Sequence, residues 1–140
     1  MKTFLKFVLN IVIYIAIVVG VLIGMPRFLA WKLETPYPLA AITSGSMWPV
    51  LHEGDLIFIE GVSRSDLAVD DIVVWQNPKG FTIHRITKLN ETTLITKGDA
   101  NFTEDEPVRY EDVIGRTYKL FGKNARIPYL GMVSVYANQK

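Results

Sequence analysis

The sequence of 140 residues contains no cysteine. This absence excludes a disulfide scaffold, a thiolate nucleophile and a cysteine-ligated zinc site. Charge is also nearly balanced, with 15 basic and 14 acidic residues, and no basic stripe interleaved with aromatics is present. The composition therefore gives no argument for a nucleic-acid partner. Because 49% of the residues are hydrophobic and no low-complexity tract occurs, a folded chain with one domain is expected.

A long hydrophobic run near the N-terminus is the first feature that the sequence does have. Residues 1–6 form a short basic segment, and residues 7–25 carry no charge. As a helix the run would rise roughly 28 Å, close to the thickness of a bilayer's hydrocarbon core. It is long for a cleaved signal peptide, and Met25-Pro26-Arg27 is a poor cleavage site. We therefore interpret residues 7–25 as a transmembrane signal-anchor helix that ends at Pro26.

The charges that flank this run bear on its orientation. Two lysines precede it, and Arg27 and Lys32 follow it. Because a short N-terminal segment before a single span commonly stays inside, we expect the N-terminus inside and the rest of the chain outside. Residues 26–40 would then form a juxtamembrane linker and residues 41–140 an extracytoplasmic domain. The membrane would be the cell membrane or, in a eukaryote, that of the endoplasmic reticulum.

The chain beyond residue 40 has the pattern of a mainly β protein. Short runs rich in β-branched and aromatic residues alternate with turn residues, and they predict strands at Leu56–Ile59, Ile72–Trp75, Phe81–Ile86, Thr93–Thr96 and Val113–Phe121. Their spacing favours a compact barrel or folded sheet. Two weaker expectations are a helical turn in Ser65–Asp71 and, for Ile127–Tyr136, a closing strand or a short membrane-facing segment. The predicted fold is thus a folded β-sheet or barrel domain behind one N-terminal transmembrane helix.

One serine in residues 41–49 is a candidate nucleophile. Ser44 and Ser46 bracket a glycine, and Pro49 follows shortly after. Gly45 can adopt backbone angles that other residues resist, and the proline fixes its own φ, so a rigid exposed turn can form. Such a turn can present one hydroxyl to a substrate. The alternative interpretation is an ordinary serine-glycine turn between strands.

A hydroxyl becomes an effective nucleophile only beside a base. Of the two histidines, His52 lies in a polar turn and is expected to be a solvated loop residue. His84 lies inside a predicted strand, where a neutral imidazole can accept a proton, although a structural histidine is the alternative there. Asp99 and Asp105 follow the next strand and supply carboxylates that can orient such a ring. Serine, histidine and aspartate are the three parts of an acyl-transfer site.

The acidic residues around Asp105 also allow other interpretations. A solvated loop is one, and a cation site of the loop-carboxylate kind is another. The segment lacks the regular alternation of oxygen ligands found in helix-loop-helix calcium sites. We therefore expect neither a metal nor another cofactor.

Four segments of the chain resemble the conserved boxes of type I signal peptidases, in the same order and behind one N-terminal span. They are Ser44-Gly45-Ser46-Met47-Trp48-Pro49, Asp70-Asp71-Ile72-Val73-Val74-Trp75, Ile83-His84-Arg85-Ile86, and Lys97-Gly98-Asp99-Ala100-Asn101 with Asp105. Asp70 stands where this family usually has glycine, and Ala100 where it usually has asparagine. His84 stands where the common bacterial branch has a lysine, so the chain resembles the archaeal and endoplasmic-reticulum branch.

The resemblance implies a role for each matching residue. Ser46 would be the nucleophile, His84 the general base, Asp105 the residue that orients or charge-stabilises His84, and Asp99 a supporting residue. The Ser44 hydroxyl and the Ser46 N–H would form the oxyanion hole. Lys88 and Lys97 are the rival bases, and both are less favourable than His84. Candidate pocket residues are Met47, Val74 and Ile83.

The implied activity is that of a membrane-bound serine endopeptidase that removes N-terminal signal peptides from exported preproteins. Its partners would be those signal peptides and the lipid bilayer, with further subunits of a processing complex left open. One alternative is a peptidase of the same chemistry dedicated to a few surface-fibre or pilin-like precursors. The other is a catalytically silent, membrane-anchored subunit of a processing complex.

Overall fold

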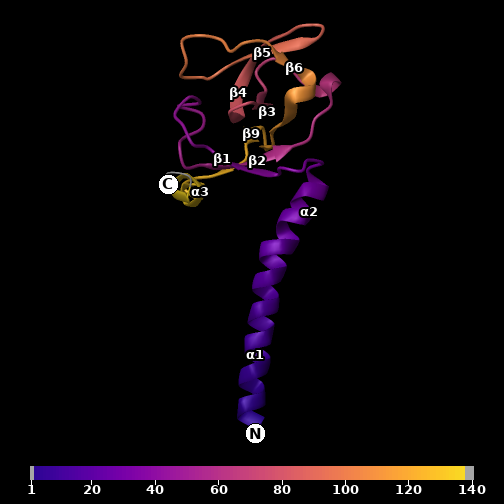
Figure 1. The fold of residues 1–140 in the computed structure, drawn as a ribbon, viewed down its shortest axis with the longest axis vertical. Coiled ribbons are helices and arrows are strands. Elements are labelled where there is room, and N and C mark those ends of the chain that lie inside the picture. The colour runs from indigo at the N-terminus through magenta and orange to yellow at the C-terminus, as the bar shows by residue number, and fades with distance from the viewer. Residues whose placement is uncertain (1, 138–140) are drawn as a thin grey trace.

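A long helix leads into a β-rich body (Figure 1). The computed structural model describes residues 2–137. Its helical elements are α1 (Lys2–Val19), the π-helical η1 (Gly20–Gly24), α2 (Met25–Lys32), the 3₁₀ turns η2 (Arg64–Asp66) and η3 (Tyr110–Asp112), and α3 (Met132–Ala137). Its strands are β1 (Leu39–Ala41), β2 (Leu56–Glu60), β3 (Ile72–Asn77), β4 (Gly80–Leu89), β5 (Thr93–Lys97), β6 (Val108–Arg109), β7 (Val113–Thr117), β8 (Lys119–Leu120), β9 (Lys123–Asn124) and β10 (Arg126–Ile127).

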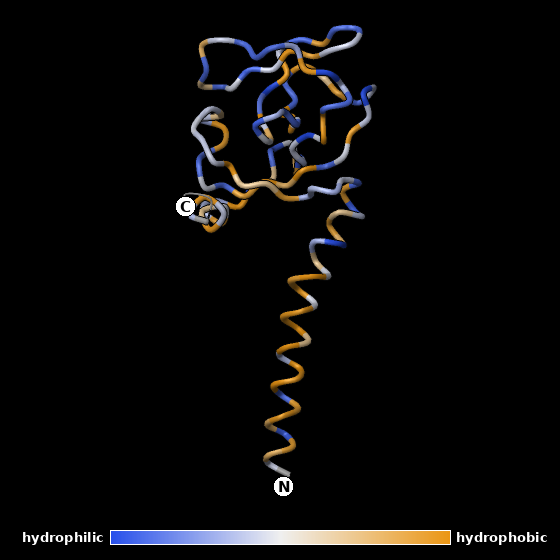
Figure 2. The backbone as a smooth tube through the Cα atoms, viewed as in Figure 1, coloured by the Kyte–Doolittle hydropathy of each residue, from blue (hydrophilic) through white to orange (hydrophobic). Residues whose placement is uncertain are grey.

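The N-terminal elements α1, η1 and α2 follow one another as a single helical rod. The segment Thr3–Lys32 is long and apolar enough to cross a membrane, and its most apolar window has no buried residue. Figure 2 shows this hydrophobic rod projecting from the β-rich body. The expectation that the helix ends at Pro26 is wrong, because α2 continues to Lys32. Proline lacks an N–H, but Pro26 lies in the first turn of α2, directly after the π-helical turn η1, where the hydrogen-bond pattern changes.

The body is built on an antiparallel sheet, as the sequence predicts for a mainly β fold. Its strand order is β1-β2-β7-β3-β4-β5-β6, and β10 pairs with β2 outside this order. The hairpin of β3 and β4 turns at Pro78-Lys79, and Val73 faces His84 across it. The four predicted strands from Leu56 to Thr96 lie within β2, β3, β4 and β5.

Three local expectations need correction. Val113–Phe121 is not one strand, because the chain leaves the main sheet after Thr117 and forms the small β8–β9 hairpin, whose turn has positive φ at Phe121 and Gly122. Ile127–Tyr136 is not a closing strand. Only its first residue belongs to a strand, and the short helix α3 follows from Met132.

The helical turn expected in Ser65–Asp71 is confined to η2, which begins one residue earlier and ends at Asp66. Helix α3 starts after Gly131, whose N–H donates to the Gly54 carbonyl at 2.9 Å. A Cβ at Gly131 would lie 2.6 Å from the Asp55 carbonyl oxygen, so the glycine permits this close approach.

Apolar side chains fill both faces of the sheet. One cluster contains Ile42, Met47, Leu51, Ile57, Ile59, Ile72 and Val74. The other contains Leu67, Val73, Ile86, Leu94 and Val108. Successive residues of β3 thus enter opposite clusters, which explains why this strand is continuously apolar instead of alternating.

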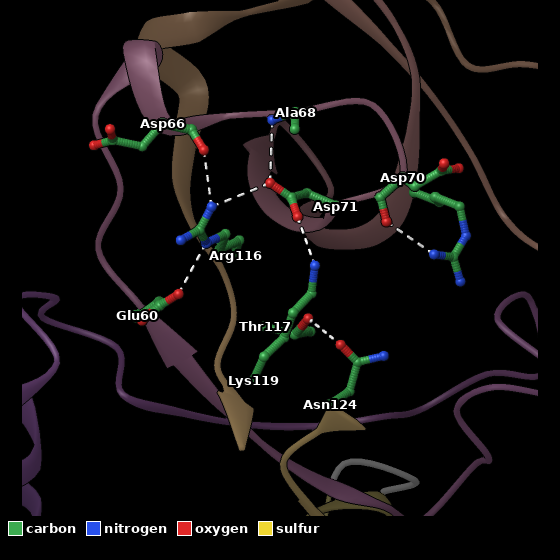
Figure 3. A network of polar contacts seen from close by, with 10 residues as sticks. Glu60, Asp66, Ala68, Asp70, Asp71, Arg116, Thr117, Lys119 and Asn124 are labelled. Atoms are coloured by element: carbon green, nitrogen blue, oxygen red, sulfur yellow. Dashed lines mark hydrogen bonds and ion pairs between the residues drawn. The ribbon is translucent and has the colours of Figure 1, made fainter. Parts of the chain in front are cut away.

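Asp71 is a buried carboxylate at the start of β3 that joins three parts of the body (Figure 3). Its two oxygens accept hydrogen bonds from the Ala68 N–H at 3.1 Å, Lys119 Nζ at 2.8 Å and Arg116 Nη1 at 3.2 Å. Burial acts to raise the pKa of Asp71, but the bonds from Lys119, Ala68 and Arg116 outweigh it, so the pKa is lowered. The ionised carboxylate is therefore the form that stabilises the fold.

We predict that Asp71→Asn is destabilising in a pH-dependent way. A carboxylate whose pKa is lower in the folded state contributes stability above its unfolded pKa, near 3.9, and this contribution is lost as the pH falls through the folded value. Loss of hydrogen bonds to a charged group should cost about 1–3 kcal/mol at neutral pH. Denaturant unfolding of both proteins in detergent should show this difference shrinking below about pH 4. A difference that stays constant from neutral pH to about pH 3 would contradict the assignment.

Asp70, the residue before it, has a φ of +75°. Its N–H donates to the Ile86 carbonyl at 3.0 Å, and its own carbonyl accepts a bond from Arg85 Nη1 at 2.9 Å, so the strained conformation is fixed by β4. Residues with a Cβ are disfavoured at such angles, whereas aspartate tolerates them better than most and glycine has no penalty. This geometry gives a physical reason for the glycine that type I signal peptidases usually have here.

We predict that Asp70→Gly stabilises the fold by about 0.5–1 kcal/mol, because relief of the left-handed backbone exceeds the extra chain entropy of glycine. Asp70→Ala is the matched control, since it removes the carboxylate and keeps the Cβ. Its free energy of unfolding should fall below that of the wild type. Equal stability of the glycine and alanine variants would show that backbone strain at this position is not the determining factor.

Candidate active site

Three polar side chains from separate segments meet in the β-rich body. Ser46 lies in the loop between β1 and β2, His84 in β4, and Asp105 in the loop between β5 and β6. His84 Nδ1 is 2.6 Å from Asp105 Oδ2, and His84 Nε2 is 3.1 Å from Ser46 Oγ. When Nδ1 carries the proton and donates a hydrogen bond to the carboxylate, the unprotonated Nε2 can accept a hydrogen bond from the serine hydroxyl. The structure thus brings together the serine, histidine and aspartate that the sequence singles out.

The loop after β5 positions this group through its backbone. The Asp105 N–H donates to the Thr96 carbonyl at 2.8 Å, and the Ala100 N–H donates to the Ser46 carbonyl at 2.9 Å. Gly98 lies against the same carbonyl, where an added Cβ would be 2.7 Å from the Ser46 oxygen. A side chain at Gly98 would therefore separate the loop from the serine. The loop after β5 thus carries the Asp105 carboxylate and is hydrogen-bonded to the backbone of Ser46.

Asp99 does not contact the histidine. Its carboxylate accepts two hydrogen bonds from Arg85, from Nε to Oδ1 and from Nη2 to Oδ2, each at 2.7 Å. The hydrogen bonds that Arg85 donates to Asp99 are the largest influence on the guanidinium, and they raise the pKa of Arg85. Arg85 and His84 are neighbours on β4 and point to opposite faces, as expected of a strand. Asp105 is therefore the partner of His84, and Asp99 holds the strand from its other side.

The rival bases lie apart from this contact. Lys88 is exposed, beyond an irregularity in the pairing of β4 and β5 that falls between Ile86 and Lys88. Lys97 is half-buried and lies opposite Arg85 in the same pairing. His52 is a largely exposed loop residue, as expected, and its Nδ1 is 3.2 Å from Arg126 Nη1.

Ser44 stands next to the nucleophile candidate, with 3.3 Å between the two hydroxyl oxygens. Both serines open onto a cleft of about 690 Å³. The three pocket residues predicted from the sequence line this cleft, namely Met47, Val74 and Ile83. Met47 and Val74 are also core residues, with 1% and 2% of their surface exposed, so they form the floor of the cleft and Ile83 is more accessible.

Sequence reasoning missed two aromatic residues of the cleft. Tyr37 and Phe81 both line it, and their ring centroids are 5.2 Å apart. Tyr37 belongs to the segment interpreted as a juxtamembrane linker, and Phe81 belongs to the β3–β4 hairpin. No local pattern connects residues 44 positions apart, and the two rings meet because the segment before β1 lies against the β3–β4 hairpin in the folded chain.

A cation site was the alternative for the acidic loop. Within residues 2–137 no group of three or more histidine, cysteine, aspartate or glutamate side chains is arranged to hold a metal ion. Asp99 and Asp105 instead have basic partners, Arg85 and His84.

A hydroxyl, an imidazole and a carboxylate in this order of contact form the arrangement of serine hydrolases. No protein-family model matches the chain. Curated relatives do. The chain is 32% identical to signal peptidase complex catalytic subunit sec11 of Neurospora crassa, over 84% of this chain and 77% of that protein. It is 31% identical to the sec11 subunit of Pyrenophora tritici-repentis, over 80% of this chain and 73% of that protein.

The same similarity extends to mammals. Signal peptidase complex catalytic subunit SEC11C of Homo sapiens is 32% identical over 72% of this chain, and the match spans 57% of that protein. The chain thus matches a little over half of the mammalian relatives' length. It belongs to the family of signal peptidase complex catalytic subunits, the endoplasmic-reticulum branch that the sequence boxes and His84 indicate.

The pair formed by Arg85 and Asp99 can be tested by a double-mutant cycle of Arg85→Met and Asp99→Asn. Both side chains are largely buried, so either single change leaves the other side chain without its ion-pair partner. The double change should therefore cost less free energy of unfolding than the sum of the two single changes. We predict a coupling energy between about 0.5 and 3 kcal/mol in denaturant unfolding. Additive effects of the two changes would show that the contact does not hold β4 to the loop.

Proposed function

We propose that this chain is a membrane-anchored serine endopeptidase that removes N-terminal signal peptides from exported preproteins. The observation that carries the proposal is the position of His84, with one ring nitrogen on Ser46 and the other on Asp105. Membership in the signal peptidase family supplies the substrate class. Ser46 is assigned as nucleophile, His84 as general base and Asp105 as the residue that orients it.

The geometry supports acyl transfer in two steps. His84 Nε2 takes the proton of the Ser46 hydroxyl as Oγ bonds to the scissile carbonyl carbon. The same proton then passes to the leaving amide nitrogen, the C–N bond breaks, and an acyl-enzyme on Ser46 remains. Water, deprotonated by His84, hydrolyses that ester and restores the serine. Asp105 stabilises the imidazolium that forms in each step.

Two groups can stabilise the negative oxygen of the tetrahedral intermediates. We assign the Ser44 hydroxyl and the Ser46 backbone N–H to this oxyanion hole, because both lie beside the attacking oxygen. Preorganised donors of this kind typically contribute a few kcal/mol to catalysis. Asp99 is assigned a supporting role, through Arg85, in holding β4 next to the nucleophile loop.

The cleft suits an extended peptide with small side chains. Strand β1 lies at one edge of the main sheet and lines the cleft through Leu39, Ala40 and Ala41. An extended substrate can pair with such an edge and place alternate side chains into pockets. Met47, Val74 and Ile83 would form the apolar pocket floor, which leaves room for small residues next to the cleaved bond.

We place residues 7–25 across the bilayer, within a helical rod that continues to Lys32. In this arrangement residues 1–6 are cytoplasmic and residues 41–140 form the peptidase domain on the opposite side of the cell or endoplasmic-reticulum membrane. Residues 26–40 connect the two, and their last two residues already belong to strand β1 of the peptidase domain. The cleft would then meet peptide bonds just beyond the membrane-embedded part of a preprotein. The relatives are named as subunits of a complex, so further subunits are proposed as partners of this chain as well.

Cleavage of a labelled preprotein by the full chain in liposomes tests the proposal. We predict that Ser46→Ala and His84→Ala each reduce kcat by several orders of magnitude, as in other serine triads. Lys88→Ala is the matched control, because this lysine is the rival base on the same strand, and it should retain activity.

Mass spectrometry of the products should show a single cut after a small residue. Activity that survives His84→Ala and disappears in Lys88→Ala would contradict the assigned base. Turnover of only a pilin-like precursor would favour the dedicated enzyme. A wild-type chain that cuts no preprotein, even with its complex reconstituted, would favour the silent subunit.

A further inference from the structure

A buried hydroxyl lies behind the carboxylate of Asp105 and is absent from the catalytic scheme above. Thr96, on β5, has 0% of its surface exposed, and its Oγ1 donates to Asp105 Oδ2 at 2.6 Å. We propose that Thr96 is a positioning residue of the active site, which fixes the Asp105 carboxylate and through it the His84 ring. The proposal deepens the proposed peptidase function and rests on it.

Thr96 holds Asp105 at two points. Its carbonyl accepts a hydrogen bond from the Asp105 N–H at 2.8 Å, and its hydroxyl donates to the carboxylate. Thr96 itself belongs to a strand paired with β4, opposite Ile86. A carboxylate held to the backbone alone could still rotate about its side-chain bonds. The second contact ties its orientation to the sheet that also carries His84.

Thr96 and His84 donate to the same oxygen. Asp105 Oδ2 is 2.6 Å from Thr96 Oγ1 and 2.6 Å from His84 Nδ1. A carboxylate oxygen can accept both hydrogen bonds. The two donors also share one negative charge. Without the hydroxyl, the oxygen has more charge available to an imidazolium at His84.

The other charged groups of this region are directed elsewhere or lie on its surface. On β4, Arg85 is bound to Asp99. In the loop that carries Asp105, Glu104 accepts a bond from Thr87, and Glu106 is exposed. Lys97 follows Thr96 on β5, where successive side chains alternate faces. Lys79 lines the cleft that His84 also lines, and its side chain is exposed. In the described part of the chain, the direct contacts of the Asp105 carboxylate are His84 and Thr96.

Two consequences follow for a variant that lacks the hydroxyl. The His84–Asp105 pair stays bonded, but it is less rigidly attached to β5, so the ring is less often aligned with Ser46 and kcat falls. The imidazolium is stabilised more strongly by the carboxylate, so His84 retains its proton to higher pH. In a plot of kcat/KM against pH, the rise on the acid side (the acid limb) then moves to higher pH, because only the neutral ring can act as base. KM should change little, since Thr96 is fully buried and is not among the residues that line the cleft.

Thr96→Val, an isosteric change without the hydroxyl, tests this prediction in the full chain in detergent, with Thr96→Ala as its substitute if valine prevents folding. Thr96→Ser keeps the hydroxyl and should restore the wild-type behaviour. Thr117→Val is the matched control, because Thr117 is also a strand residue with 0% exposure. Its hydroxyl donates to Asn124 at 2.8 Å (Figure 3), and neither residue is among those that line the cleft.

We expect kcat for a labelled preprotein to fall about 10- to 100-fold in Thr96→Val, the factor for one hydrogen bond to a charged group. KM should stay within about twofold and the acid limb should move to higher pH, whereas Thr117→Val should show neither change in kcat nor a moved limb. The proposal is overturned by full activity of Thr96→Val, by a serine variant as weak as the valine variant, or by an unmoved limb.

A second readout needs no substrate and so separates this proposal from the peptidase assignment. The chain has two histidines, His52 and His84, so ring resonances in an NMR titration can be assigned with His52→Asn. The midpoint of the His84 titration should move to higher pH in Thr96→Val, and that of His52 should stay. An unchanged or lowered His84 midpoint overturns the positioning role. A moved midpoint in a chain that cleaves no preprotein would uphold the contact and refute the function.

Discussion

Two backbone hydrogen bonds hold the candidate site together, and both come from the loop after β5. One joins the Ala100 N–H to the carbonyl of Ser46, and the other joins the Asp105 N–H to the carbonyl of Thr96. The first fixes the nucleophile loop and the second fixes the carboxylate. Backbone bonds of this kind do not depend on side-chain rotamers, so they fix the two backbone segments from which the Ser46 and Asp105 side chains project. Gly98 is part of the same constraint, since no side chain fits between the loop and Ser46.

Two neighbouring side chains of β4 make polar contacts on opposite faces of the strand. His84 points towards Ser46 and Asp105, and Arg85 points to the opposite face and binds Asp99. The guanidinium also donates to the carbonyl of Asp70, the residue with positive φ before β3. The polar groups on both sides of β4 are therefore joined to each other. Arg85 thereby ties β4 to the loop after β5 and to the turn before β3, and these contacts help to keep the His84 ring next to Ser46.

Much of this could be predicted from the sequence because the informative patterns are local. The strand that holds His84, the serine-glycine turn around Ser46 and the apolar N-terminal helix each have a signature within a few residues. The residue pattern alone does not choose between Asp99 and Asp105 as the partner of His84, because the loop between them has no periodic pattern; the family resemblance favours Asp105. The same limit applies to the aromatic contact of Tyr37 and Phe81.

The ends of helices and strands were also predicted less well than the elements themselves. Proline usually ends a helix, but at Pro26 a preceding π-helical turn lets the helix continue to Lys32. The apolar residues of 127–136 fit a strand as well as a helix when the segment is short. There the close packing of Gly131 on Gly54 and Asp55 determines where α3 begins. In this second case a contact between distant segments sets the boundary, and such a contact cannot be read from a local pattern.

The central claim is that Ser46 attacks the substrate with the help of His84. Rapid acid quenching of the full chain during turnover of a labelled preprotein, followed by peptide mass spectrometry, tests it most directly. The account predicts an acyl group on the peptide that contains Ser46, formed much more slowly in His84→Ala. An acyl group on another residue, or turnover with undiminished acylation of Ser46 after His84→Ala, would contradict it.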